Sequence, residues 1–309
     1  MVVRNGLRGV SMSVSTNQIV WPMGAAKRSS RLQRAWSRFA HDRMPVVGLL
    51  WLLILVIVAI FGQSLAPYPL VGDLASANQA PSIAHLFGTN NLGQDMLTVC
   101  MYGIRYTLEV GAGATVIAFL IGVVIGLVSG MAGGIVDQIL MRFTDLMYSF
   151  PSLLFAIMLV QLFGESVFSI AFVLGITQWA GFSRLTRGLV LSIRNSELVE
   201  SGHAIGATPF FISTRYVLPH VINSIIVYTA FFAVNAITLE AMMSIFEGIG
   251  PNPPMMSFGS LLIAGVPNVL GFPWMMAMPV LVFISILIAL VVVGEGLQAA
   301  LNPKGTTTL

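Results

Sequence analysis

Six long apolar segments divide this chain of 309 residues, with polar, glycine-rich or proline-rich stretches between them. Each segment has about 20 residues, the length that a helix needs to cross a hydrocarbon core of about 30 Å. Hydrophobic residues make up 56% of the chain and charged residues only 9%, more apolar surface than one water-soluble core would bury. The sequence therefore predicts an all-α polytopic membrane protein with six transmembrane helices, at about 46–66, 107–130, 143–163, 167–187, 218–243 and 273–297.

The first apolar segment has an alternative interpretation as a cleaved secretory signal. Ser64-Leu65-Ala66 resembles a cleavage site. Against this, 45 residues precede the segment, and it is longer than the usual apolar region of about 7–15 residues. We expect the segment to be retained as the first transmembrane helix.

Basic residues indicate how the chain is oriented. Of the fifteen Lys and Arg residues, fourteen lie in the two terminal tails or around the connections between spans two and three and between spans four and five. Arg105 alone lies on the other side. Because cytoplasmic connections carry an excess of basic residues, the sequence predicts that both termini and the 188–217 loop are cytoplasmic.

The chain is expected to have two parts, a cytoplasmic N-terminal tail at 1–45 and a transmembrane domain at 46–309. Within the tail, 27–43 places apolar residues such as Trp36 on one helical face and Arg34 on another. This pattern predicts an amphipathic helix in the headgroup layer. A solvated basic stretch that only sets topology is the alternative.

A polar, glycine-containing stretch, 197–219, lies between the fourth and fifth apolar segments. A few residues would be enough to join two spans, but the whole connection between these two, 188–217, has about thirty, including Glu197, Glu200 and Arg215. Such a segment on the cytoplasmic side is expected to bind a soluble partner. The alternative, a merely solvated loop, would have little need of so many small residues.

Two features predict how the spans pack. Gly122, Gly126 and Gly130 follow one another at four-residue spacing in the second span, which lets another helix approach closely. We expect static helix packing there, with a sliding surface as the alternative. Pro151, early in the third span, predicts a kink because proline interrupts the helical hydrogen bonds.

Acidic residues in or near the spans are few. Asp145, Glu240 and Glu295 are costly in lipid and such residues usually have a function. Asp145, however, follows Arg142 by three residues, close enough for an ion pair within one helix. No acidic residue lies at the centre of a span beside a second one, which argues against a proton or sodium relay.

Sequence patterns of catalytic and metal sites are absent. There is no HExxH, no GxSxG and no GxxxxGK[ST] phosphate loop. The single Cys100 excludes an internal disulfide and a cysteine-based zinc site. We assign no catalytic residue, no metal ligand and no cofactor to this chain. If ATP drives the protein, its nucleotide site must lie on another chain.

Five motifs occur in order over about residues 85–303. They are HLFGTNNLGQDMLTVCMYGIRYTL at 85–108, GGIVDQILMRFTDLMYSFPSLL at 133–154, an EAA-type loop with Glu200, Ala204, Gly206, Ala207 and Leu218-Pro219, EAMMSIFEGIGPNPP at 240–254, and GEGLQAALNP at 294–303. In these motifs the chain resembles the inner-membrane permease subunits of peptide-type ABC importers. It is most similar to the second permease of dipeptide, oligopeptide and nickel systems.

The resemblance implies a type I ABC importer permease, with six transmembrane helices preceded by an interfacial helix. In such importers a short cytoplasmic coupling helix docks in a groove of the ATPase. Gly206 would supply an uncommon backbone angle at its bend. The residues implied in ATPase coupling are Glu197, Glu200, Ser201, Gly202, Ala204, Gly206, Ala207 and Pro219.

The resemblance also implies the partners. They are a second homologous permease, two ATPase subunits that bind ATP and magnesium, an extracytoplasmic solute-binding protein and the lipid of the cytoplasmic (inner) membrane, with no nucleic acid. The binding protein would dock on the outer face near 67–106 and 246–272. The residues implied there are Asp95, Glu247, Pro253 and Pro254.

The chain departs from the family pattern at some positions, and rival functions remain. Ser201 and Gly202 stand where two alanines are usual, and Glu247 stands where an apolar residue or glycine is usual. An ion-coupled secondary transporter would need internal repeats and paired midplane acids. An intramembrane protease would need a nucleophile and a base at membrane depth. Peptide is the first expectation for the substrate, with nickel or another small solute as the alternative.

Overall fold

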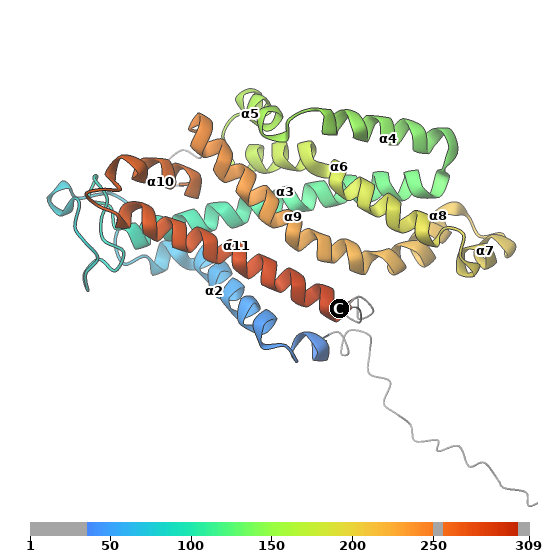
Figure 1. Cartoon of the computed structure of the whole chain (residues 1–309), viewed down its shortest axis with the longest axis horizontal. Helices are drawn as coiled ribbons and strands as arrows, with labels where there is room; N and C mark the ends of the chain where they lie inside the picture. The colour runs from blue at the N-terminus through green and yellow to red at the C-terminus, as the bar shows by residue number, and fades with distance from the viewer. Residues whose placement is uncertain (1–35, 250–255, 302–309) are drawn as a thin grey trace, which may run out of the picture.

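The protein is an elongated helical bundle, seen here in a computed structural model that describes residues 36–249 and 256–301. Helices α4 and α5 lie along one side, α2 and α11 along the other, and α3, α6 and α9 between them (Figure 1). The longer elements are α2 Arg43–Leu65, α3 Met96–Ala132, α4 Gly134–Ser149, α5 Ser152–Phe163, α6 Val167–Ile193, α9 Leu218–Glu247 and α11 Trp274–Leu301. The shorter ones are η1 Leu74–Ser76, α7 Glu197–Ala204, α8 Pro209–Ile212, η2 Ser213–Val217, α10 Phe258–Gly265 and η3 Val266–Asn268.

The expected all-helical membrane fold is present, but the count of six spans is not reproduced. Four of the described helices are long and apolar enough to cross a membrane: α2, α3, the continuous stretch Pro209–Phe246, and α11. The number rises to five if the bent pair α4 and α5 forms one span. Helix α6 has 27 residues, but Gln178, Arg184 and Arg187 interrupt its apolar character.

The third expected span, 143–163, is not one straight helix. It is divided between α4, which begins at Gly134, and α5, with a bend of 88° between them. The break lies at Phe150 and Pro151, since Pro151 has no N–H to continue the helical bonds of α4. The bend exceeds the expected kink.

Two apolar clusters hold the bundle together. In the first, Tyr106 and Val110 of α3 pack with Leu174 and Phe182 of α6 and with Phe232 of α9. The second joins α2, α3, α10 and α11, and includes Leu55, Val99, Phe258 and Ile286. Helix α6 therefore lies inside the bundle, with its most extensive contact along α3.

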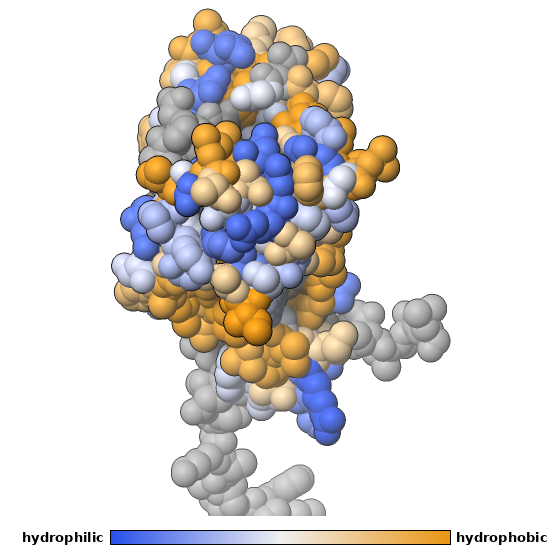
Figure 2. Space-filling view, turned by 90° about the vertical axis from the view of Figure 1, so that its left-hand side faces the viewer, coloured by the Kyte–Doolittle hydropathy of each residue, from blue (hydrophilic) through white to orange (hydrophobic). Residues whose placement is uncertain are grey.

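The two ends of the bundle differ. One end, termed the α10 end, carries α10 and the 66–95 loop, and Figure 2 shows a polar patch in its centre with apolar surface along the sides. The opposite end, termed the α7 end, carries α7, the start of α2 and the end of α11 (Figure 1). A polar end with apolar flanks is the surface expected of a bundle that stands across a membrane.

The ion pairs differ from the expectation in one place. Asp145 accepts a hydrogen bond from Arg184 of α6 at 2.6 Å, instead of pairing with Arg142 on its own helix. The guanidinium of Arg184 also lies over the ring of Tyr148, 4.0 Å from its centroid. Glu240 is buried in α9 and accepts a bond from Ser244. Glu295 is exposed.

The predicted interfacial helix falls only partly in the described residues. Positions 36–39 are helical, and α2 begins after a turn at Asp42, whose carboxylate caps Met44 N. Trp36 stacks on Phe39, and Phe39 is buried. The remaining residues of that prediction, 27–35, lie outside the described ranges.

Candidate functional site

The polar stretch after the fourth span contains a short helix, α7. Helix α6 continues to Ile193, and Arg194 closes it. Ser196 is the N-cap of α7, and Glu197 and Glu200 lie in the first turn of the helix. Carboxylates at this position interact favourably with the helix dipole. Helix α6 therefore continues six residues past 187, the expected end of the fourth span, into the stretch expected to form the loop from 188.

Helix α7 has a buried face and an exposed face. Val199 and Gly202, three residues apart, point inward and contact α8 and η2. A Cβ placed at Gly202 would lie 3.3 Å from Ile212. The outer face is formed by exposed residues that were all expected to contact an ATPase: Glu197, Glu200, Ser201 and Ala204. Gly202 was expected there too, but it packs inside the chain.

A sharp bend follows α7 at Gly206. Its φ of +76° lies in the left-handed region that favours glycine, as the sequence predicted. No atom lies within 4 Å of a Cβ built there, so the bend is open to solvent. Ala207, after the bend, is partly buried against the cluster that contains Val199.

An irregular helical stretch leads to Pro219, the last of the residues expected in ATPase coupling. Thr208 caps α8 by accepting a bond from Phe211 N, and α8 runs through the π-helical turn η2 into α9. A proline interferes with the carbonyl four residues earlier, which here is that of Arg215. The wider turn η2 precedes Pro219 and relieves this crowding, so the helix continues.

The glycine stripe of α3 lies against α6. A Cβ at Gly122 would lie 2.5 Å from the Trp179 carbonyl oxygen, and one at Gly126 would lie 2.5 Å from that of Ser183. At Gly130 the neighbour is Val190, at 2.7 Å. The two backbones therefore approach so closely that no side chain fits between them.

An ionic cluster joins α3, α4 and α6 at the α7 end. Arg187 donates two bonds to the carboxylate of Asp137, at 2.6 and 2.7 Å, and the hydroxyl of Ser129 donates to the same carboxylate. Arg194 donates to the carbonyl of Gly130 at 3.3 Å. This bidentate pair holds the start of α4 to α6, ten residues before α7 begins.

A groove separates the α7 segment from α3. It has a volume of about 1050 Å³, and its wall on α3 is apolar, with Val124 and Val128 exposed. Glu200 and His203 of α7 lie on the opposite side, with Phe210 of α8. The α7 segment is thus attached at its base and free on both of its outer sides.

Among residues 36–249 and 256–301, no three His, Cys, Asp or Glu side chains are close enough to hold a metal ion. Cys100 is buried in α3. The geometry at the α7 end therefore suggests contact with another macromolecule, since exposed small and acidic residues stand on a short helix outside the bundle.

Comparison with known families decides among the classes of membrane protein. Residues 122–306 match the family described as the binding-protein-dependent transport system inner membrane component. The chain belongs to this family. Residues 30–81 also match the N-terminal TM domain of oligopeptide transport permease C.

Curated relatives cover most of the chain. The dipeptide transport system permease protein DppC of Bacillus subtilis (strain 168) is 38% identical over 277 residues, 89% of this chain and 86% of that protein. The oligopeptide transport system permease protein OppC of the same organism is 33% identical, covering 90% and 92%. The glutathione transport system permease protein GsiD of Shigella dysenteriae is 32% identical, covering 87% and 89%.

These matches confirm the expected class of function. The protein is a multi-pass permease subunit of an ATP-driven importer of the inner membrane, and a component of a larger ABC transport system. An ion-coupled secondary transporter, the main rival, is not supported. The family description names a transport component of the membrane, not a catalyst.

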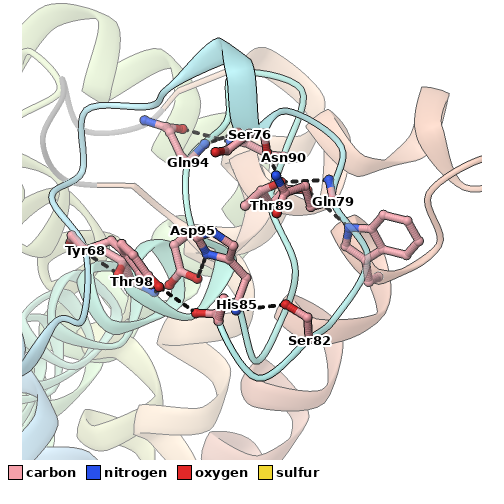
Figure 3. A network of polar contacts seen from close by, with 12 residues as sticks. Tyr68, Ser76, Gln79, Ser82, His85, Thr89, Asn90, Gln94, Asp95 and Thr98 are labelled. Carbon is pink, nitrogen blue, oxygen red and sulfur yellow. Dashed lines mark hydrogen bonds and ion pairs between the residues drawn. The ribbon is translucent and has the colours of Figure 1, made fainter.

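At the α10 end of the permease, Asp95 does not have the expected exposure. Its side chain is only 1% exposed, because its carboxylate caps α3 at Thr98 N, 2.8 Å away, and bonds Nδ1 of His85 at 3.0 Å. Figure 3 shows both contacts inside the 66–95 loop. Asp95 therefore positions the loop and cannot contact a binding protein directly.

The same loop is tied to the bundle by further polar contacts. The hydroxyl of Thr89 accepts a hydrogen bond from the N–H of Gln79 at 2.8 Å. The carbonyl of Thr89 accepts one from Nε1 of Trp274 in α11 at 3.1 Å. Tyr68 packs on the His85 ring and donates to the Ala84 carbonyl (Figure 3). The loop is an ordered cap on the permease.

Replacement of Asp95 is expected to loosen this cap. Asp95→Ala removes both the helix cap and the bond to His85, so the cap should lose about 1–2 kcal/mol of local stability. Asp95→Asn, the control, keeps an oxygen for Thr98 N and should lose less. Hydrogen exchange of the 66–95 amides in the membrane measures the difference. Equal exchange in the alanine variant and the wild type would contradict this role.

The other residues expected to dock the binding protein have less to report. Glu247 is the last residue of α9. Pro253 and Pro254 lie outside the described residues.

Sequence reasoning missed two apolar residues beside the Gly206 bend, Ile205 and Phe210, which are 75% and 78% exposed. What distinguishes these two residues is their exposure outside the bundle, and the sequence alone does not show whether an apolar residue is exposed.

Proposed function

We propose that this permease is driven through α7, which docks in an ATPase subunit on the cytoplasmic side. The observation that carries this proposal is the two-sided character of α7. Its outer face offers Glu200, Ser201 and Ala204, while its inner face packs through Val199 and Gly202 against α8 and η2, which continue into α9. A force on the outer face is therefore transmitted to a transmembrane helix.

The exposed residues beside the bend extend this docking surface. Ile205 and Phe210 present large apolar side chains on either side of Gly206. Exposed apolar side chains of this size can contribute apolar contact area to a docked partner. Glu197 and Glu200, exposed on α7, add acidic groups to the surface available to a partner.

The proposed assembly has five subunits or more. A second homologous permease completes the translocation path, two ATPase subunits carry ATP and magnesium, and a solute-binding protein delivers the substrate at the α10 end. The absence of a phosphate-loop pattern from the sequence supports a nucleotide site on other chains. In this arrangement the permease holds no catalytic residue, cofactor or metal.

The α7 end and both termini are proposed to be cytoplasmic. Fourteen of the fifteen Lys and Arg residues support this orientation. The start of α2 and the end of α11 lie close to each other and, like α7, on the side of the bundle away from the α10 end (Figure 1). The α10 end, with its ordered polar cap, then faces the binding protein.

Peptide is the proposed substrate class. Three relatives are named for dipeptide, oligopeptide and glutathione transport, and each covers at least 87% of this chain. All three named solutes contain amide bonds between amino acids. ATP binding would close the ATPases, move α7 and rock the helices between two openings, as alternating access requires.

Reconstitution tests this proposal. The permease is co-expressed with its partner permease and ATPases, placed in liposomes and supplied with its binding protein and labelled dialanine, trialanine or glutathione. We expect uptake of at least one peptide, with stimulated ATP hydrolysis and no effect of an ionophore at constant ATP. Loss of uptake with the ionophore, or import of none of the three peptides, would overturn it.

A further inference from the structure

A cavity of about 570 Å³ lies where the third span is broken. Its walls come from the α4–α5 break, from α6 and from α9. The volume is within the range of about 300–1,000 Å³ that small-ligand pockets have. The cavity is separate from the α7 segment, the outer cap and the ionic cluster, and none of these explains it.

The polar residues of this cavity stand near the middle of their helices. Gln178 lies near the centre of α6 and Asn235 in the central part of α9. A side-chain amide at this depth is costly in lipid unless it faces the protein interior or a path through it. Both residues line the cavity, so their amides are placed to bind a molecule inside it.

The amide of Gln178 is not satisfied within the chain. Its Nε2 is buried and has no hydrogen-bond partner among the described residues. The neighbouring Thr177 differs, because its hydroxyl donates to the carbonyls of Val173 and Leu174. An unpaired buried donor costs about 1–3 kcal/mol, so Gln178 gains from any ligand that brings a carbonyl oxygen. Rotation about the terminal torsion of Gln costs little.

Gly181 keeps the cavity open between two tyrosine hydroxyls. A Cβ at Gly181 would lie 2.6 Å from the Tyr228 hydroxyl oxygen and 3.3 Å from that of Tyr148. Tyr228 is held by an edge contact with Phe182, and Tyr148 by the guanidinium of Arg184. Two hydroxyls from different helices thus converge on a space that any larger residue at 181 would fill.

The rest of the wall is aromatic, and the lining carries no formal charge. Phe150, Phe231 and Phe232 complete it, and no acidic or basic residue is among the described residues that line it. Arg184 stands behind Tyr148, but its charge is taken up by Asp145 at 2.6 Å. Such a wall offers hydrogen bonds and apolar rings but no partner for an ion.

We propose that this cavity is the part of the permease that contacts the substrate, and that it binds the neutral peptide bonds of its cargo. Gln178 and Asn235 bond to main-chain amide groups, and the hydroxyls of Tyr148 and Tyr228 do the same from the facing side. The aromatic rings contact side chains of varied shape without selecting one. The terminal charges of the peptide are not bound by the described residues that line this cavity. The inference rests on the proposed peptide-import function.

The test replaces single amides in the reconstituted transporter. The probe is whichever of labelled dialanine, trialanine and glutathione the wild type imports. Gln178→Leu keeps a similar volume and loses the amide, and is expected to raise the KM for uptake about tenfold, with less than twofold change in the maximal rate. Gln178→Asn, which retains an amide, should recover part of this loss. Gln298→Leu, an amide on α11 outside the cavity, is the matched control.

A second variant tests the space instead of the bonds. Gly181→Leu would fill the gap between the two hydroxyls and should lower uptake at least tenfold, while Gly188→Leu, on the same helix with no atom within 4 Å of its Cβ, should not. Asn235→Leu carries the same expectation as Gln178→Leu if the latter assembles poorly.

The outcomes separate the two proposals. If the wild type imports a peptide but the KM is unchanged in Gln178→Leu and Asn235→Leu, the cavity is not the contact surface and only this inference is overturned. A parallel loss of maximal ATP hydrolysis and uptake in these variants overturns it as well, because it points to a structural role. If the wild type imports none of the three peptides, the proposed substrate class is wrong.

Discussion

Gly126→Leu is expected to prevent the permease from accumulating as a folded chain in the membrane. At Gly126 even a Cβ would lie 2.5 Å from the Ser183 carbonyl oxygen and 2.7 Å from Thr186 Cβ. Backbone atoms of a packed helix cannot move aside as the end of a flexible side chain can. Helices α3 and α6 must therefore separate along their most extensive contact. Gly126→Ala should be milder, with an overpacking cost of about 1–3 kcal/mol.

The control for this prediction is Gly188→Ala on α6. A Cβ there meets no atom within 4 Å, so the alanine should be neutral or stabilise the helix by up to about 1 kcal/mol. The measurements are the amount of chain in membranes and the thermal stability of the purified assembly in detergent. Equal stability of the two alanine variants would contradict the packing role. Normal stability of Gly126→Ala with lost uptake would instead favour a sliding contact.

Gly206→Val combined with Glu200→Arg is expected to lower ATP-driven uptake at least tenfold without loss of the chain from the membrane. The φ of +76° at Gly206 is unfavourable for a residue with a Cβ by about 1–2 kcal/mol, and more so for a β-branched one. The bend would change, and the exposed face of α7 would also carry the opposite charge at residue 200. The interior of the bundle is untouched, since no atom lies within 4 Å of the new Cβ at 206.

Gly206→Asn is the matched control, because asparagine tolerates the left-handed region. With Glu200 unchanged, this variant should keep most of the uptake. Uptake and substrate-stimulated ATP hydrolysis are measured together in the reconstituted transporter. If the Val and Arg double variant retained normal uptake, α7 would not be the element that couples ATP hydrolysis to transport.

Much of the fold class could be predicted from the sequence because lipid imposes a simple rule on composition. A helix that faces lipid must be apolar along its whole length, so α2, α3, α9 and α11 were recognisable as runs of letters. A span was also expected at 167–187, but the helix found there, α6, lies inside the bundle and carries Gln178 and Arg184 without meeting that rule. The third span failed for a local reason, the break at Pro151.

The candidate coupling segment was predicted more fully than the outer cap. The residues from Glu197 to Ala207 lie close together in the sequence, and a local bend at Gly206 was readable from a single letter. Asp95 is the opposite case. Its role depends on His85 in a folded loop, and an aspartate in a polar loop gave no sign of being buried.

The sequence by itself determined that this protein lives in a membrane, that it belongs with importer permeases, and where the polar segment between two spans lies. These properties depend on composition and on residues that are near one another in the chain. Only the tertiary structure decided that Asp145 pairs with Arg184, that Gly202 faces inward, and that Gln178 and Tyr228 share one cavity. Each of these is a contact between separate helices, and its free energy depends on a distance that no local pattern encodes.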